Sequence, residues 1–288
     1  MKRNKKVLIS GISGFLGSYT KELLIKKGYE VYGLSRREEK ENIFKTDYSV
    51  EDLVSKFENI DGIIHLAGTR SMSEEISYYH QNEIISQNIY EAAKIVGIKY
   101  IVYASSISVY SNQENLPWSE NVETDPLNMY GVSKLSIESI GKIYSKKYSM
   151  YIKSLRFAHL FGYGEDNKYM INVFMDKAFN KEVLNVNDVK GKREFLYVKD
   201  AAKAIELALF KEISGIFNIG SNDILTNLEV AKNINKAFNN EDNINIFSNG
   251  ENMDSSYMNL NKAKTNLAYE NEYNFYEALL DIYRYKKK

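Results

Sequence analysis

The chain has 288 residues, which is enough for one large α/β domain or for a domain with a smaller appendage. Hydrophobic residues make up 44% of it, so the chain can bury a core, and this excludes an intrinsically disordered protein. Lysine plus arginine balances aspartate plus glutamate at 38 residues each. A neutral chain gives no electrostatic reason to expect a nucleic-acid partner.

The chain contains no cysteine, which excludes disulfides, thiolate nucleophiles and cysteine-ligated metals. The three histidines, His65, His80 and His159, show no metal-ligand spacing, so we expect no metal site. The apolar run Val7–Ser10 follows a basic start but is too short for a signal peptide. No stretch approaches the ~18 apolar residues of a membrane span. We therefore expect a cytoplasmic protein with no membrane partner.

Strand-sized, β-branched runs alternate with helical patterns over the first 157 residues. The runs are Val7–Ser10, Tyr29–Leu34, Gly62–Gly68, Tyr100–Ser105 and Tyr151–Phe157. Strict alternation implies right-handed βαβ units and a parallel sheet. The nearly continuous apolar character of the runs indicates a sheet covered on both faces. The sequence therefore predicts an α/β fold with a doubly wound parallel sheet of the Rossmann type.

Three glycines connect the first predicted strand to the first predicted helix. Gly11 permits a tight turn, Gly14 lets the backbone approach a pyrophosphate, and Gly17 allows close packing of helix on strand. The N-terminus of the helix then presents free N–H groups to the anion. Glycines also serve ordinary turns, but their place between strand and helix favours a dinucleotide site.

The second predicted strand ends in a hydroxyl and two guanidiniums, Ser35, Arg36 and Arg37, where enzymes that use NAD often carry an acid. These groups suit the 2′-phosphate of NADP, so NADP is slightly favoured over NAD, although both arginines could simply be solvated. Asp47 follows a further predicted strand. It could accept a hydrogen bond from the adenine amino group or act as a turn residue.

Tyr130 and Lys134 form a Y-x-x-x-K pattern on a predicted helix. Tyr90 with Lys94 matches this pattern too, but only Tyr130 follows a strand that ends in two serines by the span of one loop. Residues i and i+4 share a helix face, so the lysine lies beneath the tyrosine. A nearby ammonium favours the phenolate, which can then exchange a proton with a sugar hydroxyl. Ser106 would hydrogen-bond the same oxygen, or could instead cap a helix or turn.

The pattern loosens after Phe157. We predict helices over 169–180, 200–210, 226–238 and 275–285, and strands over 194–198 and 215–220. No linker or repeat is present. We therefore expect a dinucleotide-binding Rossmann domain over 1–157, to which 194–219 returns, and a small C-terminal substrate-binding lobe made of 158–193 and 220–288.

Taken together, these motifs resemble the extended short-chain dehydrogenase/reductase superfamily, in its nucleotide-sugar epimerase, dehydratase and reductase branch. The resemblance covers nearly the whole chain. It rests on Gly11–Gly17 (GISGFLG), His65–Gly68 (HLAG), Ser105–Tyr110 (SSISVY), Pro126–Lys134 (PLNMYGVSK), Leu155–Gly164 (LRFAHLFGYG), Arg193–Asp200 (REFLYVKD) and Phe217–Gly220 (FNIG).

The resemblance implies a catalytic role for Ser106, Tyr130 and Lys134, with Lys134 also holding the nicotinamide ribose. It implies that Asp47 contacts adenine and that Arg193 reaches the substrate diphosphate. Arg193 could instead pair with a neighbouring acid. Cofactor contacts are expected from the same motifs and from the two strand ends, at Gly11, Gly14, Phe15, Leu16, Gly17, Ser35, Arg36, Asp47, Tyr48, Leu66, Ala67, Gly68 and Lys134.

The chain departs from the family pattern at two places. His159 stands where the family usually has an asparagine that contacts the substrate diphosphate. It could bind substrate or be an ordinary core histidine. The 4,6-dehydratases carry an Asp-Glu pair after the catalytic hydroxyl, whereas Ile107 and Ser108 follow Ser106 here. The acid–base pair for water elimination is therefore missing.

We therefore expect an NAD(P)-dependent epimerase or 4-ketoreductase that moves a hydride to or from a nucleotide-diphosphate sugar at C4. Ser35, Arg36 and the short lobe point toward the reductase without deciding the matter. The alternative from another class is a non-catalytic dinucleotide-binding sensor or scaffold on the same fold. The predicted helices before and after Ser106 resemble those that form homodimer interfaces in the family.

Overall fold

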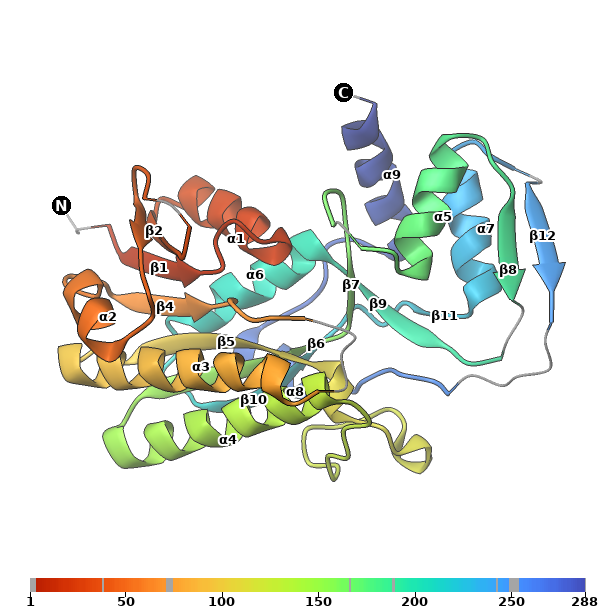
Figure 1. The fold of residues 1–288 in the computed structure, drawn as a ribbon. Coiled ribbons are helices and arrows are strands. Elements are labelled where there is room, and N and C mark those ends of the chain that lie inside the picture. Colours follow the sequence, from red (N-terminus) through yellow and green to blue (C-terminus); the bar gives the residue numbers. More distant parts are fainter. Residues whose placement is uncertain are drawn as a thin grey trace.

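The computed structural model describes residues 4–37, 39–70, 75–165, 167–187, 190–241, 243–248 and 254–287. A seven-stranded sheet in the order β10-β6-β5-β4-β1-β2-β3 forms its centre, and every strand pair in it is parallel (Figure 1). The strands are β1 (Lys6–Ser10), β2 (Glu30–Ser35), β3 (Ile43–Lys45), β4 (Gly62–His65), β5 (Tyr100–Ser106), β6 (Tyr151–Phe157) and β10 (Gly215–Ile219).

Helices cover both faces of this sheet. On one face α1 (Phe15–Lys26) packs on α6 (Val198–Leu209), and on the other α3 (Ser77–Val96) packs between α2 (Val50–Lys56) and α4 (Met129–Tyr148). The strand order reverses between β1 and β4, which is where open α/β sheets bind ligands at their carboxyl ends. The expected Rossmann fold is confirmed.

The C-terminal lobe lies to the right of the main sheet in Figure 1, and its described residues form two small sheets flanked by helices. One sheet has the order β11-β9-β7 and the other pairs β12 with β8. The elements are β7 (His159–Phe161), β8 (Leu184–Asn187), β9 (Arg193–Tyr197), β11 (Ile224–Leu225), β12 (Ile244–Phe247), α5 (Met170–Phe179), α7 (Asn227–Ala237) and α9 (Phe275–Lys286).

The structure differs from the predicted elements at three places. β9 pairs with β7 and β11, so of the segment 194–219 only α6 and β10 join the main sheet. β4 ends at His65, three residues before the predicted end at Gly68. Several short elements had no predicted counterpart: β7, β8, β11, β12, α8 (Asn261–Leu267), η1 (Ile107–Val109) and η2 (Gln113–Asn115).

Two apolar clusters hold the layers together. The larger one continues from the α1 and α6 side of the sheet into the lobe, where Phe161, Phe195 and Phe275 pack with ring centroids 5.0–6.4 Å apart. The smaller one lies beneath α2, α3 and α4. Burial on both sides explains why these strands are apolar along their whole length. The lobe is thus anchored to the sheet by a shared core.

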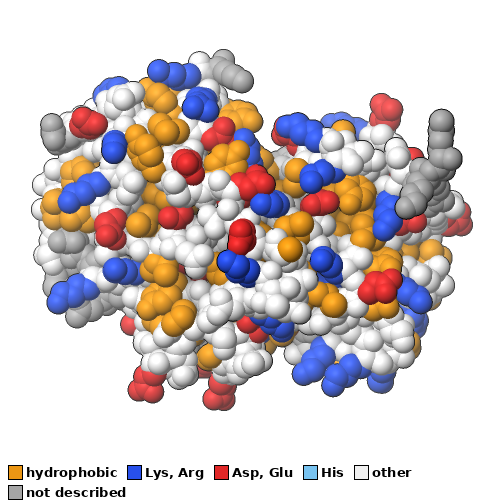
Figure 2. All heavy atoms as spheres, turned by 180° about the vertical axis from the view of Figure 1, so that it is seen from behind, with side chains coloured by type: hydrophobic (Ala, Val, Ile, Leu, Met, Phe, Trp, Pro, Cys, Tyr) orange, Lys and Arg blue, Asp and Glu red, His pale blue; other side chains and the backbone are white. Residues whose placement is uncertain are grey.

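The surface carries charges of both signs. On the face opposite to that of Figure 1, lysine and arginine side chains are interspersed with aspartate and glutamate (Figure 2). Exposed ion pairs include Lys26 with Glu22 at 2.6 Å and Lys264 with Glu270 at 2.8 Å. Within the described ranges, no helix combines the length and apolar character that crossing a bilayer requires.

Candidate active site

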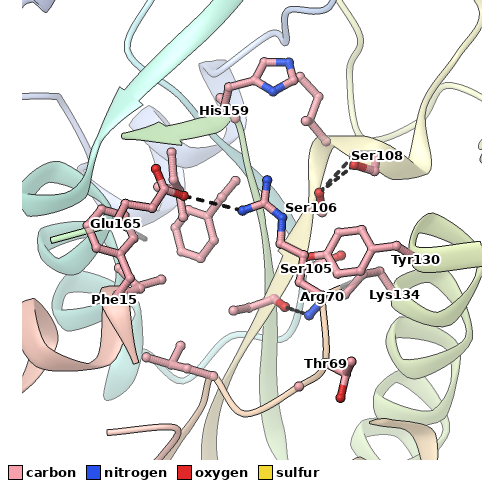
Figure 3. A pocket seen from close by; sticks show the side chains of 18 residues that line it. Phe15, Thr69, Arg70, Ser105, Ser106, Ser108, Tyr130, Lys134, His159 and Glu165 are labelled. Atoms are coloured by element: carbon pink, nitrogen blue, oxygen red, sulfur yellow. Dashed lines mark hydrogen bonds and ion pairs between the residues drawn. The ribbon is translucent and has the colours of Figure 1, made fainter. Parts of the chain in front are cut away.

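A cavity of about 230 Å³ lies at the carboxyl ends of β4, β5 and β6, between the glycine loop, α4 and the first residues of the lobe (Figure 3). Eight of the predicted site residues line it together: Phe15, Leu16, Leu66, Gly68, Ser106, Tyr130, Lys134 and His159. The sequence motifs that carry these residues span 145 positions of the chain, and the parallel sheet brings their strand ends to one edge. The fold thus assembles one candidate site from five separate motifs.

The glycine loop fits a dinucleotide phosphate. Gly11 has a φ of +75°, and a Cβ there would lie 2.8 Å from the backbone nitrogen of Ala67. A Cβ on Gly17 would lie 2.1 Å from the carbonyl oxygen of Gly11, so only glycine lets α1 start this close to β1. Gly14 caps α1 without a side-chain hydrogen bond, which leaves the N–H groups of the first turn open to an anion.

Tyr130 and Lys134 share one face of α4. Asn128 caps this helix by accepting a hydrogen bond from the N–H of Gly131 at 2.8 Å, which places Tyr130 in the first turn. The Nζ of Lys134 lies 5.4 Å from the centre of the Tyr130 ring and 4.8 Å from that of Tyr103, and it donates to the carbonyl of Ala104. The lysine is therefore held between α4 and β5.

The electrostatics of this pair differ in one respect from the sequence-based expectation. Burial raises the pKa of Tyr130, and the positive charge that opposes this is that of Arg70, together with a hydrogen bond from Ser106. Burial lowers the pKa of Lys134, Glu138 opposes the shift and Arg70 adds to it, so that the pKa is about 8. The ammonium therefore titrates near neutral pH in this site.

Ser106 combines the two roles that the sequence left open. Its Oγ accepts a hydrogen bond from the N–H of Ser108 at 3.1 Å and so caps η1, and it also lies 3.1 Å from the hydroxyl oxygen of Ser108. Its hydroxyl nevertheless faces the cavity and contacts Tyr130. The cap fixes the side chain in the orientation in which it meets the tyrosine.

Sequence reasoning missed two charged residues of the site, Arg70 and Glu165. Arg70 follows β4, and its guanidinium lies in the middle of the cavity between Glu165 and Ser106 (Figure 3). It is 3.6 Å from the carboxylate of Glu165, which comes from the loop after β7, and 4.7 Å from the ring of Tyr169. The signal available in the sequence was the position of Arg70 two residues beyond the HLAG motif.

Two histidines, His65 and His159, are held as neutral groups. His65 is fully buried between Ser10 and Ser86, at 2.7 and 2.8 Å, and burial lowers its pKa to about 3. His159 hydrogen-bonds the hydroxyl of Ser256 through Nε2 at 2.8 Å and faces the cavity. Burial and two nearby arginines lower its pKa to about 4. His159 is therefore a hydrogen-bonding group and carries no charge at neutral pH.

Arg193 does not line the cavity, although it is one of the arginines that lower the pKa of His159. It is half-buried at the start of β9, where its backbone pairs with Leu225 of β11 and forms an isolated β-bridge with Ser256. Its place beyond His159 extends the candidate site from the cavity toward the lobe.

The residues expected at the adenosine end lie apart from the cavity. Ser35 is the last residue of β2, opposite Lys45 of β3, and its hydroxyl accepts a hydrogen bond from the N–H of Arg37 at 3.2 Å. Arg36 follows it and lowers the pKa of the buried Tyr48, which burial raises to about 12. Asp47 is exposed and accepts from the N–H of Ser49 at 2.7 Å. The four residues predicted for the adenosine end, Ser35, Arg36, Asp47 and Tyr48, thus lie at or just beyond the ends of β2 and β3.

A doubly wound sheet, a glycine loop that opens a helix, and a tyrosine–lysine pair beside a strand-end serine together define a dinucleotide-dependent enzyme of the extended short-chain dehydrogenase/reductase type. The chain matches the family model described as "NAD dependent epimerase/dehydratase family" over residues 7–220, and it belongs to this family.

Individual relatives agree with this assignment. A crystal structure of UDP-N-acetylglucosamine 4-epimerase from Bacillus cereus is 45% identical, with a TM-score of 0.93 and coverage of 99% of this chain and 97% of that one. A putative UDP-glucose 4-epimerase of Methanocaldococcus jannaschii is 32% identical over 234 residues, 75% of this chain and 76% of the relative. A UDP-glucose 4-epimerase from Thermotoga maritima, at 24% identity and a TM-score of 0.86, shares the fold.

Proposed function

We propose that this enzyme is a 4-epimerase of UDP-hexoses that keeps its dinucleotide bound through the cycle, with UDP-N-acetylglucosamine as the first substrate to test. The observation that carries the proposal is the convergence of Ser106, Tyr130 and Lys134 on one cavity beside the glycine loop. The choice of sugar is supported by the 45% identity to a protein described as UDP-N-acetylglucosamine 4-epimerase.

The side chains divide the chemistry as follows. A bound nicotinamide supplies the acceptor and later the donor of the C4 hydride. Tyr130 takes the proton of the C4 hydroxyl as the hydride leaves, and returns it to the C4 oxygen when the hydride is delivered to the other face. Ser106 hydrogen-bonds the same oxygen. Lys134 would hold the nicotinamide ribose, and its ammonium, 5.4 Å from the centre of the Tyr130 ring, would add to the charge of Arg70 in favouring the phenolate.

The substrate end of the site is assigned to His159 and Arg193. A neutral His159, fixed by Ser256, can hydrogen-bond a diphosphate or sugar oxygen without adding charge. The guanidinium of Arg193 can meet the diphosphate in a bidentate fashion. We assign residues 158–193 and 220–288 to the lobe that binds the substrate.

A second candidate is a 4-ketoreductase that uses NADP. It is favoured by the hydroxyl and guanidinium of Ser35 and Arg36 at the end of β2, which suit a 2′-phosphate. The two candidates differ in how they handle the cofactor. An epimerase regenerates its dinucleotide in every cycle, whereas a reductase must exchange it in every turnover.

We propose a homodimer formed by α3 and α4. These neighbouring helices expose apolar side chains away from the sheet: Tyr78, Ile84, Ile95, Val132, Ile143 and Tyr148. Side chains of this kind on two adjacent helices suit a four-helix interface with a second copy. Replacing Ile84 and Ile143 by glutamate should give a monomer in sedimentation velocity, and an unchanged dimer would exclude this face.

The functional test is incubation of the purified protein with UDP-N-acetylglucosamine, UDP-glucose and UDP-glucuronic acid, without added dinucleotide. Proton NMR of the sugar should show the C4 epimer accumulating toward equilibrium. Conversion that requires added NADPH and a 4-keto sugar would instead support the reductase. Dinucleotide binding without conversion of any substrate would support the sensor. Tyr90→Phe is the matched control for Tyr130→Phe, because Tyr90 begins another Y-x-x-x-K pattern and its buried hydroxyl has no hydrogen-bond partner.

A further inference from the structure

A buried charged network lies directly behind the candidate catalytic residues. Glu138 is 4% exposed and stands one helical turn beyond Lys134 and two beyond Tyr130 on the same face of α4. Its carboxylate accepts hydrogen bonds from Nε and Nη2 of Arg156 at 2.9 and 2.6 Å, and from the hydroxyl of Ser105. A carboxylate buried this deeply is stable only with such partners.

The partners of Glu138 come from the two strands that form the floor of the site. Ser105 and Arg156 face each other in the register of β5 and β6. Ser105 immediately precedes Ser106, and Lys134 donates to Ala104, so consecutive residues of β5 are bound to consecutive turns of α4. Arg156 also donates to the hydroxyl of Tyr110 at 2.6 Å, which extends the network to the loop after η1.

We infer that Glu138 is a positioning residue for the catalytic trio: its carboxylate ties the end of β5 to α4 and supplies the negative charge that faces Lys134. This inference rests on the role proposed for Lys134. The two functions of Glu138 are separable, because the hydrogen bonds depend on its shape and the effect on Lys134 depends on its charge.

The titratable groups around Lys134 and Glu138 set the direction in which the pKa of Lys134 should change when Glu138 is replaced. The groups that face Lys134 are Arg70 from the loop after β4, His65 from β4, Tyr103 from β5, and Tyr130 and Glu138 from α4. Those that face Glu138 are Arg156 from β6, Tyr90 from α3, Tyr103 from β5, and Lys134. Of these, Glu138 is the group that raises the pKa of Lys134, against burial and Arg70. Removing its charge must therefore lower that pKa.

Lys153 provides an internal control. Among the described lysines, two have a pKa that is lowered overall, with burial as the largest cause: Lys134, to about 8, and Lys153, to about 7. The Nζ of Lys153 donates to the carbonyls of Leu209 and Lys211 at the end of α6, on the other face of the sheet from α4. Its titration has no contribution from Glu138.

The experiment follows the titration of lysine Cε by carbon-13 NMR in the protein as purified, without added substrate. Resonances are assigned with Lys134→Met and Lys153→Met. In Glu138→Gln the midpoint of Lys134 should fall by about one pH unit while that of Lys153 stays in place. Glu138→Asp keeps the charge, so its Lys134 midpoint should stay close to that of the wild type. An unchanged Lys134 midpoint in Glu138→Gln, or equal shifts of both lysines, would overturn the inference.

A buried arginine left without its partner could prevent Glu138→Gln from folding. The double variant Glu138→Gln/Arg156→Gln removes both charges and keeps two hydrogen-bonding amides, and the same fall in the Lys134 midpoint is expected from it. The NMR readout needs no turnover, so the two proposals can fail separately. If the protein showed no epimerase activity, the proposed function would be refuted, and a fall in the Lys134 midpoint in Glu138→Gln would still support the role of Glu138.

Discussion

The ammonium of Lys134 donates a hydrogen bond to the main-chain carbonyl of Ala104, with 2.7 Å between nitrogen and oxygen. Ala104 lies two residues before Ser106 on β5, and Lys134 lies one turn after Tyr130 on α4. This bond therefore sets the distance between the strand that carries the serine and the helix that carries the tyrosine. Its donor, together with Arg70, is also one of the two positive charges beside Tyr130 that the proposed proton transfer uses.

Tyr130→Phe should reduce turnover by at least about 100-fold, because the variant lacks the proton carrier of a general acid–base step. Its dinucleotide affinity should be nearly unchanged, since the ring remains. Steady-state rates and binding calorimetry measure the two effects. Tyr90→Phe should retain the wild-type rate. A Tyr130→Phe enzyme that kept a tenth of the wild-type rate would show that another group carries the proton.

The pH dependence of turnover should follow Lys134. Its pKa is lowered to about 8, and the ammonium is the form that supports Tyr130, so activity should fall as pH rises through about 8. Unfolding does not explain this fall. The native state binds fewer protons than the unfolded chain between about 8 and the ordinary lysine value of 10.5, so this group makes the free energy of unfolding rise with pH there.

Arg70→Gln should move the alkaline limit of the pH–rate profile to higher pH, because Arg70 lowers the pKa of both Lys134 and Tyr130. We expect a shift of about half a pH unit, since the guanidinium is half exposed and partly screened. The measurement is the profile of kcat between pH 6 and 10. Arg284→Gln, at the far end of the chain in α9, is the control. A shift toward lower pH would contradict the assignment.

Two glycines of the loop should respond differently to substitution. Gly14→Val should abolish dinucleotide binding with a smaller loss of stability than Gly17→Ala, because Gly14 is exposed, has a φ of −76° and would place its Cβ 3.2 Å from the carbonyl oxygen of Gly11. Gly17→Ala should destabilise the fold by about 2 kcal/mol, since its Cβ would lie 2.1 Å from the carbonyl of Gly11. Binding calorimetry with NAD measures the effect on dinucleotide affinity, and urea unfolding measures the effect on stability. If Gly14→Val bound the dinucleotide with wild-type affinity, the glycine loop could not be part of the dinucleotide site.

Cofactor choice should depend on the end of β2. Arg36 can form charge-assisted hydrogen bonds to a 2′-phosphate, and we expect a preference for NADP of about tenfold, near 1.4 kcal/mol. Arg36→Ala should erase this preference, and Ser35→Asp should reverse it by accepting from a hydroxyl and repelling a phosphate. Dissociation constants for NAD and NADP at moderate salt test the idea. Equal wild-type affinities would identify these arginines as surface charges and strengthen the case for an epimerase with permanently bound NAD.

The sheet and the trio were predictable because each depends on a local pattern. Apolar runs alternating with amphipathic segments define a parallel sheet, and such a sheet brings its strand ends together. Ser106, Tyr130 and Lys134 could thus be grouped although they come from different elements. β9 was assigned to the Rossmann domain with the rest of 194–219 but pairs with β7 and β11, because a strand signal does not specify its pairing partner. β12 was missed because its four residues, INIF, include one asparagine and are mostly exposed, so no buried apolar run marks the strand.

The remaining site residues could not be predicted because their roles depend on tertiary contacts. Arg70 and Glu165 lie in loops 95 positions apart, and nothing local to either indicates that they meet. Glu138 could be placed on the face of Tyr130 by its spacing. Its burial follows only from Arg156 on a neighbouring strand, and a glutamate at that helical position is ordinarily solvated.

The most direct test of the central claim is the fate of a deuterium label at C4 of UDP-N-acetylglucosamine, in water and without added dinucleotide. If the hydride leaves C4 for a bound nicotinamide and returns to the same carbon, the C4 epimer should carry its full label, with no hydrogen derived from water. Tyr130→Phe should form almost no epimer. Epimer that has exchanged its label with solvent would contradict hydride transfer at C4, and so would conversion by Tyr130→Phe at the wild-type rate.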